Sequence, residues 1–420
     1  MRQVRLVRAG LSQVLPLLYA AGIGSTASGQ SYTMTVLSTL RTDGGGVSLG
    51  LGVNASGVVV GRAETDSGEL HVARWNSSGV IADLGTLVSP YPSVAFDINA
   101  SGELCGAGST QSSGFASALR QSGAGSLVNL PEGSGGGDSY GYGIADDGTI
   151  VGWTNFAQGC GSYVCAGNPG HAVRWVGTSI SLLPDLGGYY SVASDISHDG
   201  SVICGFGANP GGQTRAYRLV GVAGTAVALA PLAGDSDSYG NGVNNAGDVV
   251  GYSIVSGGSA HAVLWPAGST VATNLGTLAG ALHAYPQSIN ASGVIVGYCD
   301  FGGGTSRAVR FSPGAAPQDL NSLIAPVPGW TVSYADEVSD NGKITGDAFD
   351  GTNHRAMVLT PPCVGDVNGD HQVNTIDPGQ LLSKFGQSVV AGTLGDINGD
   401  GVVNTIDLGT LLSHFGQPCP

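Results

Sequence analysis

Two acidic segments near the C-terminus have the composition of metal-binding loops. The stretch GDVNGDHQVNTID begins at Gly365, and GDINGDGVVNTID begins 30 residues later at Gly395. Oxygen-bearing side chains stand at alternate positions, as in an EF-hand-type loop, whose Ca²⁺ ligands occupy positions 1, 3, 5, 7, 9 and 12. Carboxylates this dense would repel one another without a hard cation between them. We therefore expect one Ca²⁺ ion in each loop, or two in all.

The ligand positions can be assigned one by one, with position 7 contributing its backbone carbonyl. In the first loop they are Asp366, Asn368, Asp370, Gln372, Asn374 and Asp377. In the second loop they are Asp396, Asn398, Asp400, Val402, Asn404 and Asp407. The alternative interpretation is a pair of acidic turns that hold no metal.

A short helix is expected after each loop, because leucine and phenylalanine recur there at helical spacing. Two half EF-hands with Asp at position 12 resemble the type I dockerin module. The resemblance covers about residues 363–420, and we predict a dockerin-like domain at residues 361–420. The resemblance implies that Ca²⁺ folds the module and that a helix face docks on a cohesin-like partner or extracellular scaffold. It also implies that partner choice depends on loop positions 10 and 11, which are Thr375, Ile376, Thr405 and Ile406.

The first 29 residues read as a secretory signal peptide. Arg2, Arg5 and Arg8 form a basic start, an apolar stretch runs from about Ala9 to Ala21, and small residues surround Ala27. A membrane anchor is the alternative, but the stretch is shorter than the ~20 residues needed to span, and no later segment is long and apolar enough. We expect a protein that is secreted, extracellular or at the cell surface.

Cysteine and charge content add two expectations. In a secreted chain, Cys363 with Cys419 and Cys160 with Cys165 are reasonable disulfides, since each pair brackets one segment. Cys105 and Cys204 stand where other copies of a repeat have valine, so we expect them to be buried, whereas Cys299 has no obvious partner. The formal charge of −15 makes nucleic acid an improbable partner.

A sequence unit of about 46 residues repeats seven times between residues 30 and 360, and each copy contains one version of a short motif. Versions include GVNASGVVVG, DINASGELCG and SINASGVIVG, and their turn glycines are Gly57, Gly102, Gly148, Gly200, Gly247, Gly293 and Gly342. Each copy predicts four short strands, which is typical of a β-propeller blade. The fold class is therefore an all-β, seven-bladed propeller followed by a small α-helical calcium-binding, dockerin-like domain.

The seventh copy lacks its last strand, and Thr35–Leu40 near the mature N-terminus has no copy of its own. We expect this orphan strand to complete blade seven and close the ring; a solenoid of the same repeats is the alternative. The phrases HAVRW, HAVLW, INASGVIVGY and DLGTL resemble the HAF repeats of secreted bacterial proteins, over about residues 35–360. That resemblance implies an extracellular location rather than a reaction.

The remaining charged residues give little support to catalysis. Five arginines share one slot of the repeat and His71, His171 and His261 share another, which favours structural roles; the arginines are Arg74, Arg120, Arg174, Arg218 and Arg310. Carboxylate pairs that could serve glycoside hydrolysis, such as Asp235 with Asp237 and Asp336 with Glu337, stand next to turns. No Ser-His-Asp pattern, HExxH motif or phosphate-binding loop is evident.

The sequence thus predicts a non-catalytic propeller that presents a ligand-binding surface, with polysaccharide as a candidate ligand, and that is attached through its dockerin-like tail. The alternative is a polysaccharide-degrading enzyme, of glycoside hydrolase or lyase type, carried by the same tail; a third hypothesis makes the tail a stabilising clasp only. Acids with raised pKa values in the central channel would favour the enzyme. Aromatic side chains on one rim would favour the binding module.

Overall fold

A computed structural model describes residues 32–420 except 111–115, 134–136, 156–169, 222, 256, 326, 371, 391, 417–418 and 420. The signal-peptide segment and the Cys160 and Cys165 pair lie outside the described residues. The chain divides into two compact units, one with residues 35–322 and 328–358, the other with 359–420 and two short segments. None of the described helices has the length and apolar character needed to cross a membrane.

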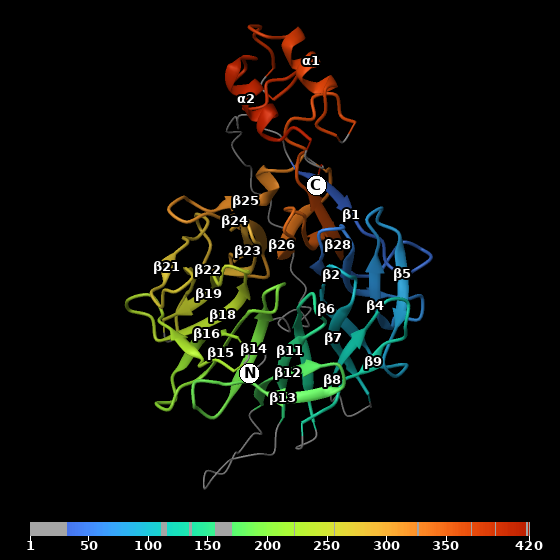
Figure 1. Cartoon of the computed structure of the whole chain (residues 1–420). Helices are drawn as coiled ribbons and strands as arrows, with labels where there is room; N and C mark the ends of the chain where they lie inside the picture. The colour runs from blue at the N-terminus through green and yellow to red at the C-terminus, as the bar shows by residue number, and fades with distance from the viewer. Residues whose placement is uncertain are drawn as a thin grey trace. The chain divides into compact units, whose positions relative to one another are not determined.

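The first unit consists of seven four-stranded antiparallel sheets (Figure 1). Blade 1 contains β2 (Ser48–Val53), β3 (Val59–Glu64), β4 (Leu70–Trp75) and β5 (Ile81–Gly85), and blade 2 contains β6 (Ser93–Ile98), β7 (Leu104–Ser109), β8 (Ala116–Gln121) and β9 (Val128–Asn129). Blade 3 contains β10 (Ser139–Ile144), β11 (Ile150–Thr154), β12 (His171–Val176) and β13 (Ser179–Leu182). Blade 4 contains β14 (Ser191–Ile196), β15 (Val202–Ala208), β16 (Thr214–Val220) and β17 (Val227–Leu229). Blade 5 contains β18 (Asp237–Val243), β19 (Val249–Ile254), β20 (Ala260–Trp265) and β21 (Thr273–Asn274). Blade 6 contains β22 (His283–Ile289), β23 (Ile295–Asp300), β24 (Ser306–Phe311) and β25 (Gln318–Asp319), followed by the 3-10 turn η2 (Leu320–Ser322). Blade 7 contains β26 (Thr331–Val338), β27 (Ile344–Phe349), β28 (His354–Thr360) and β1 (Thr33–Val36).

The first strand of each blade lies innermost, and these seven strands contact one another in a closed cycle that includes β26 with β2. The prediction of a seven-bladed, all-β propeller is confirmed. The alternative of an open solenoid is wrong, because blade 1 packs against blade 7 through β2, β26 and β27. The ring thereby removes the exposed faces that a solenoid would have to cap.

The orphan strand has the predicted role but different bounds. It was expected over Thr35–Leu40, whereas β1 spans Thr33–Val36 and forms the outer strand of blade 7, next to β28. After Leu37, whose N–H donates to the Ala356 carbonyl at 2.8 Å, the chain turns to blade 1. There the Ser38 carbonyl accepts the indole N–H of Trp75 at 2.9 Å, which explains why the strand ends early.

The repeated phrase forms the hairpin between the first and second strand of each blade. All seven predicted turn glycines have positive φ, from +74° to +88°, which explains the need for glycine there. The third strands carry the largest core residues, Trp75, Trp175 and Trp265, all at most 1% exposed. Cys105 and Cys204 are buried, as predicted, and, like the buried Cys299, form no disulfide with another described residue.

The C-terminal unit contains two helices, α1 (Ile376–Ser383) and α2 (Thr405–Ser413), one after each acidic loop. Its core consists of Val373, Leu381, Ile397, Val403 and Leu411. The two halves are linked reciprocally, since the Gly386 N–H donates to the Val403 carbonyl (2.7 Å) and the Gly416 N–H donates to the Val373 carbonyl (2.8 Å). A disulfide joins Cys363 to Cys419 across the unit, with 5.0 Å between the Cα atoms.

Candidate functional site

The first acidic loop is curled by hydrogen bonds from its own backbone. Asp366 Oδ1 accepts the N–H groups of Gly369 (2.6 Å) and Asp370 (3.2 Å), and Asp370 Oδ1 accepts that of Gln372 (2.9 Å). The amides of Asn368 and Asn374 both donate to Asp370 Oδ2, at 2.9 and 3.4 Å. Three predicted ligand positions, 3, 5 and 9, therefore converge on one point.

The second loop repeats this geometry. Asn398 and Asn404 donate their amide N–H groups to Asp400 Oδ2, again at 2.9 and 3.4 Å. The Asn398 contact holds the pKa of the exposed Asp400 carboxyl below its usual range. Asp396 is nearly buried and accepts the Gly401 N–H at 2.8 Å. Gly401, at loop position 6, has φ +85°, which is the sharp turn that a loop of this type requires.

Position 12 closes each loop from inside. Asp407 is fully buried, its Oδ1 accepts the N–H groups of Ile397 (2.8 Å) and Asn398 (3.0 Å), and its Oδ2 accepts that of Asn404 (2.8 Å). Asn404 in turn caps α2 by accepting the Ile406 N–H at 2.7 Å. Asp377 makes the corresponding three bonds in the first loop, so the two position-12 carboxylates anchor loop and helix together.

The donor set suits Ca²⁺, which prefers carboxylate, amide and carbonyl oxygens. The asparagine oxygens accept backbone N–H groups of the same loop, as Asn368 Oδ1 does from Asp370 at 2.8 Å, and the amide nitrogens face Asp370 and Asp400. Among the described residues, one group of three His, Cys, Asp or Glu side chains lies within 4.8 Å, namely Cys363, Asp366 and Cys419. Both sulfurs of that group are in the disulfide, so it is no metal site.

The predicted partner-binding residues lie on the surface of the C-terminal unit. Thr375 and Thr405 are exposed, and Ile376 and Ile406 are 53% and 59% exposed. Further along the chain, four large apolar side chains are also exposed in matching pairs: Leu382 with Leu412 and Phe385 with Phe415. The two halves thus display the same apolar groups to solvent.

In the propeller, one end of the channel carries a group of acids from the innermost strands. Asp97 and Asp195 occupy the same position of the repeat, and each accepts two backbone N–H groups. Asp97 bonds Ile98 (2.7 Å) and, in the next blade, Ile144 (2.9 Å). At this level the strands approach closely, since a Cβ on Gly143 would lie 2.9 Å from Asp195 Oδ1. The acids therefore tie neighbouring blades together.

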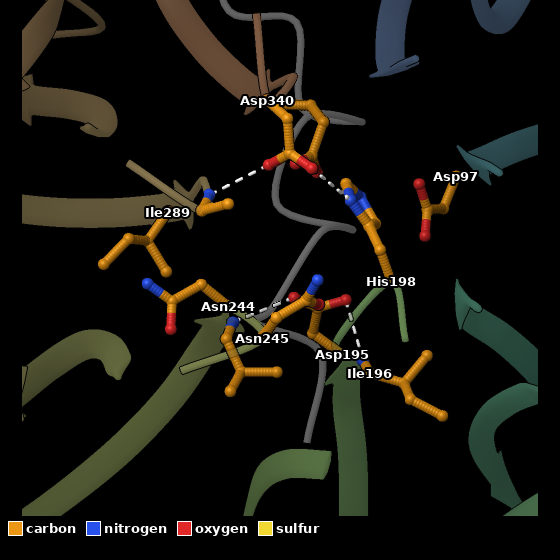
Figure 2. A pocket seen from close by; sticks show the side chains of 11 residues that line it. Asp97, Asp195, Ile196, His198, Asn244, Asn245, Ile289 and Asp340 are labelled. Atoms are coloured by element: carbon orange, nitrogen blue, oxygen red, sulfur yellow. Dashed lines mark hydrogen bonds and ion pairs between the residues drawn. The ribbon is translucent and has the colours of Figure 1, made fainter. Parts of the chain in front are cut away.

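An ion pair crosses this end of the channel, as Figure 2 shows. His198 of blade 4 reaches Asp340 of blade 7, with 3.3 Å between Nδ1 and Oδ2. The contact with Asp340, helped by the charges of Asp97 and Glu337, outweighs burial and raises the pKa of His198 to about 10. The same contact lowers the pKa of Asp340. The open space among these side chains is about 10 Å³, roughly the room needed for one water molecule.

Sequence reasoning missed His198 and Asp340, although the repeat holds a signal for them. Three copies have alanine at this position, Ala55, Ala100 and Ala291. The other copies have Asp146, His198, Asn245 and Asp340. At this position, two residues before the turn glycine that all seven copies share, a residue other than alanine indicates a role specific to its copy.

This cluster does not have the properties of an acid–base centre. A histidine with a pKa of about 10 is protonated at neutral pH and cannot accept a proton, and Asp340 has a lowered rather than raised pKa. The space is also too small for a sugar ring. The arrangement instead closes this end of the channel and links two blades that are not neighbours.

We predict that the His198 pair makes stability depend on alkaline pH. Because the folded pKa of His198 lies above its ordinary value of 6.5, its contribution is complete below pH 6.5 and is lost as pH rises to about 10. The free energy of unfolding of His198→Gln should fall below that of the parent at pH 6, and the difference should shrink by pH 10. Denaturant titrations across this range measure it, and a pH-independent difference would contradict the assignment.

The repeated histidines and arginines have structural partners. His71, His171 and His261 contact Asp83, Asp185 and Asp235 at 2.9, 3.4 and 2.9 Å through Nδ1, as expected for satisfied strand histidines. Near His261, Ser253 donates to Asp235 rather than to the histidine, so the trio lacks the order of a hydrolytic triad.

The arginine slot links blades. Arg74 donates to the Gly102 carbonyl of blade 2 at 2.8 Å, and Arg218 donates to carbonyls of blade 5. Of the carboxylates considered for glycoside hydrolysis, Asp336 is nearly buried in blade 7, whereas Asp235 and Asp237 belong to blade 5. The two carboxylate pairs, Asp235 with Asp237 and Asp336 with Glu337, therefore lie in different blades.

Aromatic rings surround the opposite end of the channel. Tyr140, Tyr239, Tyr285 and Tyr334 each stand three residues before the position that carries Asp97 in blade 2. In blades 4 to 7 the rings form a continuous series with centroids 4.7–6.4 Å apart, from Tyr190 through Phe206, Tyr239, Tyr252, Tyr285 and Tyr298 to Tyr334. We call this series the tyrosine rim. Sequence reasoning did not identify it, because its members come from separate repeats.

Comparisons with known proteins support the propeller fold. No protein-family model and no curated protein matches the chain. A puromycin hydrolase structure matches with a TM-score of 0.50 and 13% identity, covering 76% of this chain and 52% of that one. Virginiamycin B lyase from Staphylococcus aureus matches with 0.48 and 13%, covering 79% and 100%. The β-propeller domain of the Trilobed protease from Pyrococcus furiosus matches with 0.46 and 10%, covering 65% and 80%. At a TM-score of 0.50 and 13% identity, the match to the puromycin hydrolase structure shows the fold alone.

Proposed function

We propose that this protein is a secreted, calcium-dependent adhesion module, in which the C-terminal unit binds two Ca²⁺ ions and docks on a cohesin-like partner or extracellular scaffold. The observation that carries this proposal is the duplicated loop geometry, in which ligand positions 3, 5 and 9 converge on Asp370 and on Asp400. Bound Ca²⁺ would draw these oxygens together and neutralise the acidic tail. The residues of the chain would supply carboxylate, amide and backbone carbonyl oxygens to each ion.

Docking is supported by the paired apolar side chains that both halves expose. Ile376 and Ile406 lie at loop position 11, and Phe385 and Phe415 follow the two helices at 41% and 43% exposure. Large apolar groups exposed in matched pairs are typical of a protein-binding surface. The dockerin-like resemblance assigns partner choice to loop positions 10 and 11, which include Ile376 and Ile406.

The propeller is proposed as the ligand-presenting part rather than a catalyst. The acids at the channel end have structural partners, since Asp97 and Asp195 accept backbone N–H groups and Asp340 pairs with His198. Aromatic side chains on one rim favour a binding module, and the tyrosine rim supplies such side chains.

The test combines calorimetry with capture. The full mature chain should take up two Ca²⁺ per molecule in a titration, and it should retain a cohesin-like or scaffold protein from the host's secreted fraction in Ca²⁺ but not in EDTA. Ile406→Ser with Ile376→Ser should reduce capture while leaving the Ca²⁺ stoichiometry at two. Absence of Ca²⁺ uptake at millimolar concentration would refute the proposal, whereas Ca²⁺ uptake without capture would reduce the tail to a stabilising clasp.

A further inference from the structure

Two phenol groups of the tyrosine rim, those of Tyr252 and Tyr285, have no hydrogen-bond partner among the residues that the structure describes. Tyr252 is 5% exposed, and its hydroxyl makes no hydrogen bond with any other described residue; the same is true of the half-buried Tyr285. Burial, together with the neighbouring phenols of Tyr239, Tyr285, Tyr298 and Tyr190, raises the pKa of Tyr252 well above its ordinary value. Neither phenol oxygen is among the fully buried unpaired atoms, so both hydroxyls reach solvent and can donate to or accept from a hydrogen-bonding ligand.

Ring packing limits what that ligand can be. Tyr239 and Tyr252 are stacked with an interplanar angle of 10° and centroids 4.7 Å apart, so their facing surfaces leave no room for a cation between them. Tyr285 meets Tyr252 edge-on at 81° and 5.0 Å, so the two phenol rings lie nearly perpendicular to each other. A purely apolar ligand would leave the hydroxyls unsatisfied.

Charge adjacent to the rim narrows the class further. Asp237 and Asp300 are close enough to raise the pKa values of Tyr239 and Tyr285, respectively, alongside the larger effect of burial. These carboxylates accept hydrogen bonds from hydroxyl groups and repel anions. A neutral polyhydroxyl ligand with apolar C–H faces fits rings, hydroxyls and carboxylates together.

We infer that the tyrosine rim of blades 4 to 7 is a binding site for a neutral oligosaccharide, with Tyr252 and Tyr285 as its hydrogen-bonding centre. The sugar's C–H faces pack on exposed ring surface, and its hydroxyls bond the phenols and the neighbouring carboxylates. This inference rests on the proposed function in one respect, since it takes the propeller to be the binding part of the molecule.

Calorimetric titration of the full mature chain with cellohexaose, xylohexaose and mannohexaose tests it, with hexagalacturonate as the anionic counterpart. At least one neutral hexasaccharide should bind. Tyr252→Phe and Tyr285→Phe, which keep the ring packing and remove only the hydroxyl, should each weaken binding by roughly five- to tenfold. Tyr91→Phe, outside the rim, should bind like the parent, and thermal melts should show all three variants folded.

Three results would overturn the inference: no neutral hexasaccharide bound at millimolar concentration, tighter binding of hexagalacturonate, or unchanged affinity in both rim variants. Repeating the titration in EDTA separates the two proposals. Sugar binding that persists there supports the rim site whether or not the acidic loops take up Ca²⁺. A failure of Ca²⁺ uptake alone would therefore overturn the attachment proposal and leave the rim site standing.

Discussion

Asp407→Ala should unfold the second half of the C-terminal unit. The side chain is fully buried and accepts three backbone N–H groups, from Ile397, Asn398 and Asn404, all of which lose their partner. The expected loss is about 3–5 kcal/mol of unfolding free energy for this unit, with Ca²⁺ uptake falling to one ion per chain. Circular dichroism melts and Ca²⁺ calorimetry measure both effects.

Asp407→Asn is the matched control, since it keeps one acceptor oxygen but removes the charge. It should retain more helix than the alanine variant and still bind Ca²⁺ more weakly than the parent. The propeller's own melting transition should be the same in all three proteins. An alanine variant that melts like the parent and binds two Ca²⁺ ions would contradict the assigned role of position 12.

Arg218→Met should lower the unfolding free energy of the propeller by about 2–4 kcal/mol. The guanidinium is 6% exposed and donates to the carbonyls of Trp265 (2.8 Å), Pro266 (3.0 Å) and Ser269 (3.0 Å) in the next blade. Methionine fills similar volume but leaves these carbonyls without their donor. Denaturant unfolding at neutral pH measures the loss.

The same repeat slot supplies the control. Arg174 is half-buried and donates to Ser181 Oγ of its own blade at 3.0 Å. Arg174→Met should therefore change the unfolding free energy by less than about 1 kcal/mol. Equal effects of the two substitutions would show that burial between blades is not what makes Arg218 important. If sugar binding were lost in Arg218→Met while stability stayed unchanged, the packing role would be wrong.

Much of the architecture could be predicted because it depends on local, repeated signals. The turn glycines Gly57 to Gly342 need positive φ at one point of every repeat, and this requirement is visible in any single copy. The tryptophans of the third strands and the two helices after the acidic loops follow from hydrophobic periodicity in the same way. The bounds of the closing strand differ from the prediction because the Ser38 carbonyl accepts the indole N–H of Trp75 in blade 1.

The acidic loops are likewise local: every predicted ligand lies within twelve consecutive residues, and the sequence alone brings Asp366 to Asp377 into one turn of chain. The channel cluster depends instead on ring closure, and the tyrosine rim depends on the packing of adjacent blades. His198 and Asp340 are 142 residues apart and meet because blades 4 and 7 face each other across the channel. Tyr239 pairs with Tyr252 across one hairpin, and Tyr252 meets Tyr285 because adjacent blades pack against each other. Spacing along the chain fixes which residues share a strand or loop, but the side chains that meet across the ring are decided by the number of blades and by how the chain closes.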